Sequence, residues 1–387
     1  MQYFFQLGNF KGLSQAELSI VFESYNISKD SIKNFSEKIL LIDSKDLNDN
    51  LVKRIFNRLG GYIRVGRVVN DLERFLEKEY EGKVVFGLSY IGDSKFDINK
   101  FNSLAKQLKK YFRDKGVSSR FILPKKTELN AAQVRKNLML EKGFELCILE
   151  NQDSQLYGET LEIQDIDSFS DRDYNKPSVD TEMGMLPPKL ARIMCNLTGL
   201  QSGVIWDPFC GSGTIPMEAT ILGYNVLASD LNIEAVKATD KNIVWLSNNG
   251  YISDILYETF QLDITKPTGE VLKKLKHTQI DAVVFELYMG PPQTKLVTET
   301  QADTLLNDVK VLLESVIKIL EEIGKRKIKM IVIIPSYKTE SGWKTLRIRE
   351  IFSKRWYVLN KEYSKEDLKW KRNNSIICRN IFILERK

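Results

Sequence analysis

In the second half of the chain, short and almost wholly apolar runs alternate with longer helical segments. The clearest runs are GVIWD (203–207), NVLAS (225–229), IDAVVF (280–285) and KMIVIIP (329–335). A run that is apolar throughout must be covered on both faces, and parallel strands need long crossovers that are usually helical. The alternation therefore predicts an α/β domain built on a mostly parallel sheet. Near the end, RWYVLNKEYS (355–364) and SIICRNIFILER (375–386) predict an antiparallel hairpin that closes this sheet.

The first 165 residues carry two smaller patterns of mixed strands and helices. Residues 1–75 predict strand, helix, strand, helix, strand, which suits an antiparallel sheet with helices on one face. Ser14 and Glu17 have the spacing of a capping box, so the first helix is expected to open at Ser14. A chain of 387 residues is too long for one ordinary core. We therefore place domains at 1–75, 76–165 and 166–387.

Composition excludes several classes of protein. No apolar run approaches the roughly 18 residues that cross a bilayer, and the first ten residues lack the layout of a signal peptide. The four cysteines include no C-x-x-C pair, and His277 is the only histidine. A zinc site or a disulfide framework is therefore not expected, and a reducing cytoplasm fits best. We expect no metal and no membrane partner, and we assume a monomer.

Basic side chains recur on successive predicted elements of residues 76–165. We single out six as candidate RNA phosphate contacts: Lys109, Lys110, Lys125, Lys126, Arg135 and Lys136. The net charge of +6 permits an anionic partner without requiring one. Any one of these lysines is more often part of a solvated helix face. Their recurrence within one small domain favours a surface that binds nucleic acid.

The stretch WDPFCGSGTIPMEA follows the first apolar run and has the residues of a ligand-binding turn. Asp207 ends the strand, Gly211 and Gly213 permit a tight turn, and Thr214 opens a helix. The stretch lacks the third glycine of a dinucleotide fingerprint and the Gly-Lys-Ser/Thr of a P-loop, which disfavours pyrophosphate binding. Cys210 has no histidine near it in sequence, and we expect it to pack rather than react.

Two further carboxylates are predicted to end neighbouring strands. Asp230 in ASDLN lies about 20 residues after the glycine turn, where a ribose diol is held in α/β proteins. Asp263 in QLDIT is placed to accept a hydrogen bond from an adenine amino group. Each alone is more often a helix cap or a surface charge. Together with Asp207 they favour a nucleoside-shaped site, in which Phe209 and Leu231 complete the predicted cofactor contacts.

The motifs DPFCGSGT, ASDLN and QLDIT resemble those of S-adenosylmethionine-dependent methyltransferases that act on exocyclic amino groups. The preceding DTEMGMLPPKLARIMCNLTGL resembles the segment that covers the methionine end of their cofactor. With the opening LGNFKGLSQAELSIVF, the basic α/β region and YGETLEIQDIDSFSDRD, the chain resembles the THUMP-domain tRNA guanine-N2 methyltransferases. This resemblance implies a ferredoxin-like domain at 1–75, a THUMP RNA-binding domain at 76–165 and a Rossmann-like methyltransferase domain at 166–387. It also implies S-adenosylmethionine as cofactor and tRNA as partner.

The stretch VVFELYMGPP (283–292) resembles the motif at the end of the family's fourth strand. By this resemblance, Glu286 accepts hydrogen bonds from the target amine and Tyr288 stacks on the extruded base. Leu287 stands where the family has proline, and Phe285 occupies the usual acidic position. If the loop geometry has drifted, Leu287→Pro is expected to raise activity. An alternative register uses Gly-Pro-Pro-Gln (290–293), which keeps the prolines but loses the acid and the aromatic residue.

Three functions are compatible with these patterns. The leading one is methylation of the exocyclic N2 amine of a guanosine in tRNA. A DNA adenine-N6 or cytosine-N4 methyltransferase shares the glycine turn and the proline-aromatic motif, but no DNA-reading module is recognisable in this sequence. A catalytically degenerate RNA-binding protein that retains the cofactor fold is the third, because VVFELYMGPP departs from the family pattern.

Overall fold

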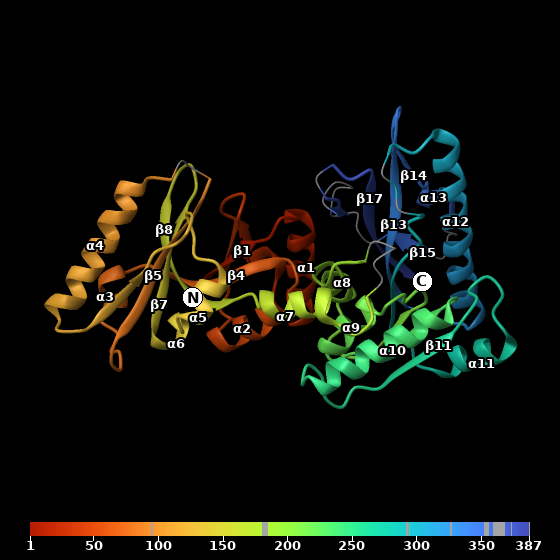
Figure 1. The fold of residues 1–387 in the computed structure, drawn as a ribbon, viewed down its shortest axis with the longest axis horizontal. Coiled ribbons are helices and arrows are strands. Elements are labelled where there is room, and N and C mark those ends of the chain that lie inside the picture. Colours follow the sequence, from red (N-terminus) through yellow and green to blue (C-terminus); the bar gives the residue numbers. More distant parts are fainter. Residues whose placement is uncertain are drawn as a thin grey trace. The chain divides into compact units, whose positions relative to one another are not determined.

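The computed structural model describes residues 1–93, 96–179, 185–291, 293, 295–325, 327–351, 356–358, 368–372 and 374–386. The chain forms two compact units. Unit 1 comprises Met1–Ser14 and Tyr25–Asp167, and unit 2 comprises Gln15–Ser24 and Ser168–Lys387. Each unit is built around one large sheet (Figure 1). Within the described part of the chain, no helix has both the length and the apolar character that crossing a membrane requires.

Unit 1 contains one sheet in the order β2-β3-β1-β4-β8-β7-β5-β6. Its strands are β1 (Gln2–Leu7), β2 (Ile32–Asn34), β3 (Ile39–Asp43), β4 (Tyr62–Val69), β5 (Val84–Gly92), β6 (Ser119–Ile122), β7 (Gly143–Glu150) and β8 (Gln155–Ile163). Its helices are the start of α1 (Lys11–Ser24), then α2 (Asp49–Arg58), α3 (Leu72–Leu76), α4 (Ile98–Asp114), α5 (Ala131–Lys136) and α6 (Met139–Lys142). The antiparallel pairing of β4 with β8 joins the strands before and after residue 75 into one sheet. A domain boundary at residue 75 remains a prediction.

Helices cover both faces of the β5–β8 half of this sheet. Phe86 on β5 packs with Phe112 of α4 in one core cluster. Val85, the neighbouring residue on the same strand, packs with Val134 and Met139 in another cluster. Because successive side chains of a strand point to opposite faces, α4 lies on one face of the sheet and α5 and α6 lie on the other (Figure 1).

The predicted capping box is wrong. Helix α1 begins at Lys11, so Ser14 lies inside the helix, where its hydroxyl donates to the carbonyl oxygens of Phe10 and Gly61. Glu17 is fully buried in unit 2 and accepts a hydrogen bond of 2.7 Å from the side chain of Asn196. The spacing of Ser14 and Glu17 therefore reflects two separate packing roles rather than a helix start.

Unit 2 holds a nine-stranded sheet whose main path is β11-β10-β9-β12-β13-β17-β15. Its strands are β9 (Val204–Asp207), β10 (Asn225–Asp230), β11 (Tyr257–Gln261), β12 (Ala282–Glu286), β13 (Lys329–Thr339), β14 (Gly342–Thr345), β15 (Trp356–Val358), β16 (Lys369–Trp370) and β17 (Ile377–Arg386). Strands β9 to β13 are parallel, whereas β17 runs antiparallel to both β13 and β15. The predicted parallel sheet and its closing antiparallel pair are confirmed. Residues 355 and 359–364 of the predicted hairpin lie outside the described residues.

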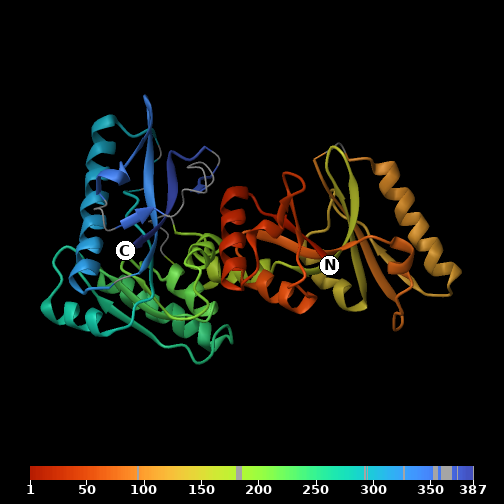
Figure 2. The same ribbon diagram turned by 180° about the vertical axis from the view of Figure 1, so that it is seen from behind.

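Helices cover both faces of this sheet too (Figures 1 and 2). They are α8 (Pro188–Leu197), α9 (Thr214–Ile221), α10 (Ile233–Asn248), α11 (Gly269–His277), α12 (Glu299–Glu322) and α13 (Ile348–Ile351). Helix α7 (Ile166–Ser170) begins in unit 1 and ends in unit 2, and a π-helical turn spans Asp171–Asn175. Val283 and Phe285 of β12 pack in one core with Leu313 and Val316 of α12. Val284, between them, is also fully buried, on the other face. This explains why the strand is apolar at every position.

The strand order places the candidate site. The chain passes from β9 outward to β10 and β11, then returns to place β12 on the other side of β9. In such a sheet, ligands bind beyond the carboxyl ends of the strands at the point where the order reverses. Asp207, Asp230 and Glu286 are the last residues of β9, β10 and β12, so they meet at this edge.

Candidate active site

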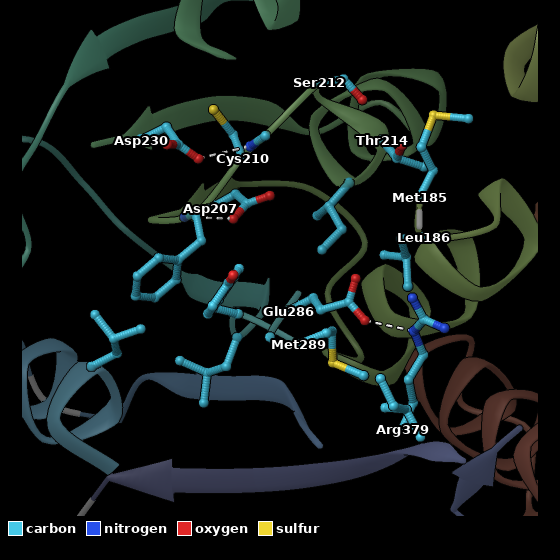
Figure 3. A pocket seen from close by; sticks show the side chains of 18 of the residues that line it. Met185, Leu186, Asp207, Cys210, Ser212, Thr214, Asp230, Glu286, Met289 and Arg379 are labelled. Atoms are coloured by element: carbon cyan, nitrogen blue, oxygen red, sulfur yellow. Dashed lines mark hydrogen bonds and ion pairs between the residues drawn. The ribbon is translucent and has the colours of Figure 1, made fainter. Parts of the chain in front are cut away.

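A cavity of about 910 Å³ opens at the carboxyl ends of the parallel strands (Figure 3). Its wall includes nine of the ten residues predicted as cofactor or catalytic contacts: Asp207, Phe209, Gly211, Thr214, Asp230, Leu231, Asp263, Glu286 and Tyr288. The predicted residues, which lie up to 81 positions apart (Asp207 to Tyr288), thus converge on one cavity of unit 2. Gly213 is the predicted residue that does not line it.

The two glycines of the turn have different roles. Gly211 has φ +51° and lines the cavity, and a side chain carbon added there would meet no atom within 4 Å. Gly213 has φ +85°, and an added carbon would lie 2.9 Å from the side chain of Thr239 on α10. Both positions need left-handed backbone, which favours glycine. Gly213 allows the close packing of α9 and α10, whereas the bare surface of Gly211 faces the cavity.

Asp207 is a buried carboxylate at the base of this turn. Its Oδ1 accepts a hydrogen bond of 3.0 Å from the backbone N–H of Phe209. Burial raises the pKa of Asp207 well above its ordinary value, and the negative charges of Asp230 and Glu286 raise it further. A cationic ligand group beside Asp207 would offset this clustering of negative charge. The site is therefore suited to a positively charged ligand.

Asp230 braces the glycine turn against the end of β10. Its Oδ2 accepts from the N–H of Gly211 at 3.0 Å, and its Oδ1 accepts from the N–H of Asn232 at 2.9 Å. An ionised carboxylate has about four lone-pair positions, so two remain for a ligand. Leu231, which follows it, is 63% exposed and lines the cavity. The carboxylate of Asp230 thus lies beside apolar surface in the cavity, and its role toward a ribose diol stays a prediction.

The carboxylate of Asp263 already accepts hydrogen bonds within its own turn, which its position in the sequence did not indicate. Its Oδ1 accepts from both the backbone N–H and the hydroxyl of Thr265, at 2.9 and 2.6 Å. These hydrogen bonds to Thr265 lower the pKa of Asp263. The residue lines the cavity but also shapes its own turn, so its role toward an adenine stays a prediction.

Cys210 lines the cavity without being an activated nucleophile. Its side chain is buried and accepts a hydrogen bond from the hydroxyl of Thr239. Burial raises the pKa of its thiol, and the nearby charge of Asp207 raises it further. A thiol in this state is largely protonated at neutral pH and is a weak nucleophile.

Glu286 enters the cavity from the end of β12 and forms an ion pair that the sequence did not reveal. The Nε of Arg379 on β17 donates to Oε1 of Glu286 at 2.6 Å (Figure 3). The two side chains are only 14% and 16% exposed. Burial raises the pKa of Glu286, and the guanidinium of Arg379 opposes that rise. The available signal was an arginine within the apolar strand β17, a position that normally needs a partner.

The neighbours of Glu286 in the motif differ in their exposure. Tyr288 is 44% exposed and lines the cavity, so its ring is accessible to a ligand. Leu287 is fully buried, and its N–H donates to the carbonyl oxygen of Ile333 at 3.1 Å. Proline has no N–H to donate, so this hydrogen bond argues against the expectation that Leu287→Pro would raise activity. Phe285, at the family's acidic position, is fully buried against Phe209 with ring centroids 5.5 Å apart.

The alternative register places its residues at the same cavity. Gly290, Pro291 and Gln293 line it, and Pro292 lies outside the described residues. Gly290 has φ +78°, and Gln293 donates its side chain N–H to the carbonyl oxygen of Pro291 at 3.0 Å. This stretch forms part of the wall beyond the strand end but supplies no carboxylate.

A buried cluster of charges lies behind the glycine turn, and no sequence motif indicated it. Glu218 on α9 accepts from the Nε of Arg172 at 2.5 Å and from the Nε of Arg192 at 2.7 Å. Lys176 is buried as well, and its Nζ donates to the hydroxyl of Thr214 at 3.1 Å. These contacts fix the chain before residue 180 against α9. Residues 180–184 of the predicted methionine-covering segment lie outside the described residues.

The six basic residues predicted to contact RNA do not share one face of unit 1. Lys109 and Lys110 are exposed on α4, whereas Lys136 is exposed on α5, which covers the opposite face of the sheet. Arg135, also on α5, forms an ion pair of 2.8 Å with Asp165. Lys125 and Lys126 are exposed in the loop between β6 and α5. The six residues therefore do not form one continuous basic surface of unit 1.

The described residues contain no group of three or more histidine, cysteine, aspartate or glutamate side chains that could hold a metal ion.

Comparisons with known proteins place this chain beside methyltransferases. Residues 176–268 match the family model of the RMKL-like methyltransferase domain. A tRNA (guanine(10)-N2)-dimethyltransferase of Methanothermobacter thermautotrophicus is 44% identical over 61 residues, which are 16% of this chain and 18% of that protein. The enzyme of the same name from Methanocaldococcus jannaschii is 29% identical over 147 residues, 36% of this chain and 38% of its own length. The matched regions thus span less than two fifths of these curated relatives.

The fold extends beyond those regions. TrmN from Thermus thermophilus has a similar structure over 100% of both chains, with a TM-score of 0.54 and 14% sequence identity. The predicted Rossmann-like methyltransferase fold is confirmed, and the bounds 166–387 stay a prediction. The resemblance to the THUMP-type tRNA guanine-N2 methyltransferases that the sequence indicated is also supported.

Proposed function

We propose, starting from this family resemblance, that the chain transfers a methyl group from S-adenosylmethionine to the exocyclic N2 amine of a guanosine in tRNA. The observation that carries the proposal is the position of Glu286. A mostly buried carboxylate stands in the same cavity as the glycine turn and Asp230. One cavity thus offers both a nucleoside-shaped surface and an acceptor for an amine.

The residues of the cavity fit the cofactor on chemical grounds. S-adenosylmethionine supplies a sulfonium-activated methyl group and carries net positive charge near its amino acid end. Asp207 is a buried carboxylate whose burial favours a cationic neighbour. Gly211 leaves its part of the wall bare, and Asp230 retains lone pairs for two ribose hydroxyls. Leu231 supplies apolar surface beside them.

Glu286 and Tyr288 would serve the base. The lone pair of a guanine amino group is delocalised into the ring, so the nitrogen is a poor nucleophile. A fixed negative acceptor stabilises the positive charge that develops on this nitrogen in the transition state. The exposed ring of Tyr288 offers a stacking face to a base that has left its helix. Leu287, buried between them, holds both side chains at the strand end.

We also propose that residues 1–165 bind the tRNA, with a ferredoxin-like domain at 1–75 and a THUMP domain at 76–165. Lys109 and Lys110 on α4 are the best candidates for phosphate contacts, because both are exposed and stand on the same helix. Arg135 is a weaker candidate, since its guanidinium already pairs with Asp165.

Incubation with isotopically labelled cofactor followed by mass analysis of nucleosides tests the proposal. Unmodified tRNA and duplex DNA are offered in parallel to the same protein. We expect labelled N2-methylguanosine or N2,N2-dimethylguanosine from the tRNA and no labelled adenine or cytosine from the DNA. Labelled adenine or cytosine in the DNA would instead establish a DNA adenine-N6 or cytosine-N4 methyltransferase. Cofactor binding and tRNA binding without any transfer would establish the degenerate RNA-binding protein.

A further inference from the structure

The ion pair between Glu286 and Arg379 joins strands that are not neighbours. In the sheet, β13 lies between β12 and β17, with Glu286 paired to Ile333 and Arg379 paired to Pro335. The side chain of Arg379 must therefore extend across β13 to reach the carboxylate. A contact of 2.6 Å over that span fixes Glu286 from the far side of a rigid strand.

Arg379 is itself held in place by an aromatic ring. Its guanidinium carbon lies 4.9 Å from the centroid of Trp370, and Trp370 is the residue that pairs with Arg379 between β16 and β17. Arginine stacks on aromatic faces while its donors remain available in the plane of the guanidinium. Trp370 and Arg379 both line the cavity. The donor that points at Glu286 is thus preorganised by its own hairpin.

The pair uses one oxygen of the carboxylate. Nε of Arg379 bonds to Oε1 of Glu286, and a carboxylate has a second oxygen with its own lone pairs. A carboxylate with one oxygen anchored cannot rotate freely, so its second oxygen has a set direction. Burial of this site disfavours the charged form of a carboxylate, and a neighbouring guanidinium restores it.

We propose that Arg379 is a positioning residue for methyl transfer, which keeps Glu286 ionised and directs its Oε2 toward the target amine. The proposal rests on the function proposed above. Without Arg379, the mostly buried Glu286 would lose the cation that favours its charged form, and a neutral acid does not stabilise a developing positive charge as an anion does. In this proposal, Arg379 acts on the reaction through Glu286, the side chain with which it is paired.

Other charged or titratable groups stand near Glu286, and the test has to separate them from Arg379. They are Asp207 on β9, Asp230 on β10, Asp263 after β11, Cys210 in the glycine turn, Tyr288 after β12, Tyr337 on β13 with its hydroxyl near Gly290, and Arg372 before β17. The acidic members make ionisation of Glu286 harder, and Arg379 is the cation in direct contact with it.

The test compares Arg379→Gln and Arg379→Lys with the parent in single-turnover methyl transfer between pH 5.5 and 9. An opposite charge at this distance lowers a carboxyl pKa by roughly 1–3 units. In Arg379→Gln the acidic limb of the rate profile should therefore move up by a similar amount, and raising the pH should restore part of the rate. Arg379→Lys keeps the charge and should keep a profile close to the parent's. Lys371→Gln, an exposed cation beside the same hairpin, is the matched control.

A direct titration makes the result independent of turnover. Glutamate labelled with ¹³C at the side-chain carboxyl reports ionisation by NMR, and Glu286→Gln identifies the signal. We expect the Glu286 midpoint to rise in Arg379→Gln and to stay near the parent value in Arg379→Lys. An unmoved midpoint, or a rate that falls by the same factor at every pH, would overturn the proposal. If the parent transfers no methyl group to tRNA, the proposed function fails, and Arg379 is then no positioning residue, whatever the titration shows of its charge effect.

Discussion

Asp230 accepts hydrogen bonds from two backbone amides and is proposed to bind the ribose diol, and one substitution tests both roles. In Asp230→Ala, the N–H groups of Gly211 and Asn232 lose their acceptor, and the ribose diol would lose its partner. Hydrogen bonds to a charged acceptor contribute roughly 1.5–3 kcal/mol each. Two ribose bonds at the lower end of this range amount to about 3 kcal/mol, or roughly a 10²-fold loss of affinity. The two backbone amides lie near solvent, and losing their acceptor should cost about 1 kcal/mol each.

Calorimetric titration with S-adenosylhomocysteine measures the first effect, and thermal melting measures the second. For a domain of this size, about 2 kcal/mol corresponds to a fall in melting temperature of roughly 4–8 °C. Glu234→Ala is the matched control, because it removes an exposed carboxylate four residues away whose pair with Lys237 is a surface contact worth little. Lower melting with unchanged affinity would reduce Asp230 to a brace for the glycine turn and refute the ribose assignment.

Three further perturbations test the base side and the RNA surface. Tyr288→Ala should weaken tRNA capture and turnover together, by roughly 1–3 kcal/mol of lost stacking, and equal turnover in this variant would remove the ring from the site. Leu287→Pro should destabilise the protein by about 3 kcal/mol, because it removes a strand hydrogen bond and a buried side chain, and an unchanged melting temperature would contradict the pairing with β13. Neutralising Lys109 and Lys110 together should flatten the log-log salt slope of tRNA binding by about 1.4–1.8. An unchanged slope would make the α4 lysines a solvated face.

Much of the fold of unit 2 follows from local patterns. Strands that are apolar at every position indicate a sheet buried on both faces. The glycine turn after β9 indicates where the strand order reverses and a ligand binds. Asp207 and Asp230 could be placed because each directly ends such a strand, and the carboxyl ends of parallel strands share one edge of the sheet. In each case a short stretch of sequence is compatible with only one position in the sheet.

The rest depends on contacts between distant parts of the chain. Arg379 lies 93 positions after Glu286, and no spacing rule connects them. The division of basic residues between two faces of unit 1 follows from which side of β5 each helix packs on, which a list of lysines does not contain. The failed capping box at Ser14 has the same cause, since a local motif was outweighed by the burial of Glu17 against Asn196.

The central claim is that Glu286 is the acceptor for the target amine in a cavity that also holds the methyl donor. Its most direct test is the single-turnover rate of Glu286→Gln with tRNA at saturating cofactor. The substitution keeps the shape and one oxygen but removes the charge, so the rate should fall by roughly 10²–10³, the scale of losing one preorganised electrostatic contact. Affinity for S-adenosylhomocysteine should stay at the parent value. Methyl transfer as fast as in the parent would show that Glu286 does not accept from the amine, and would contradict the account.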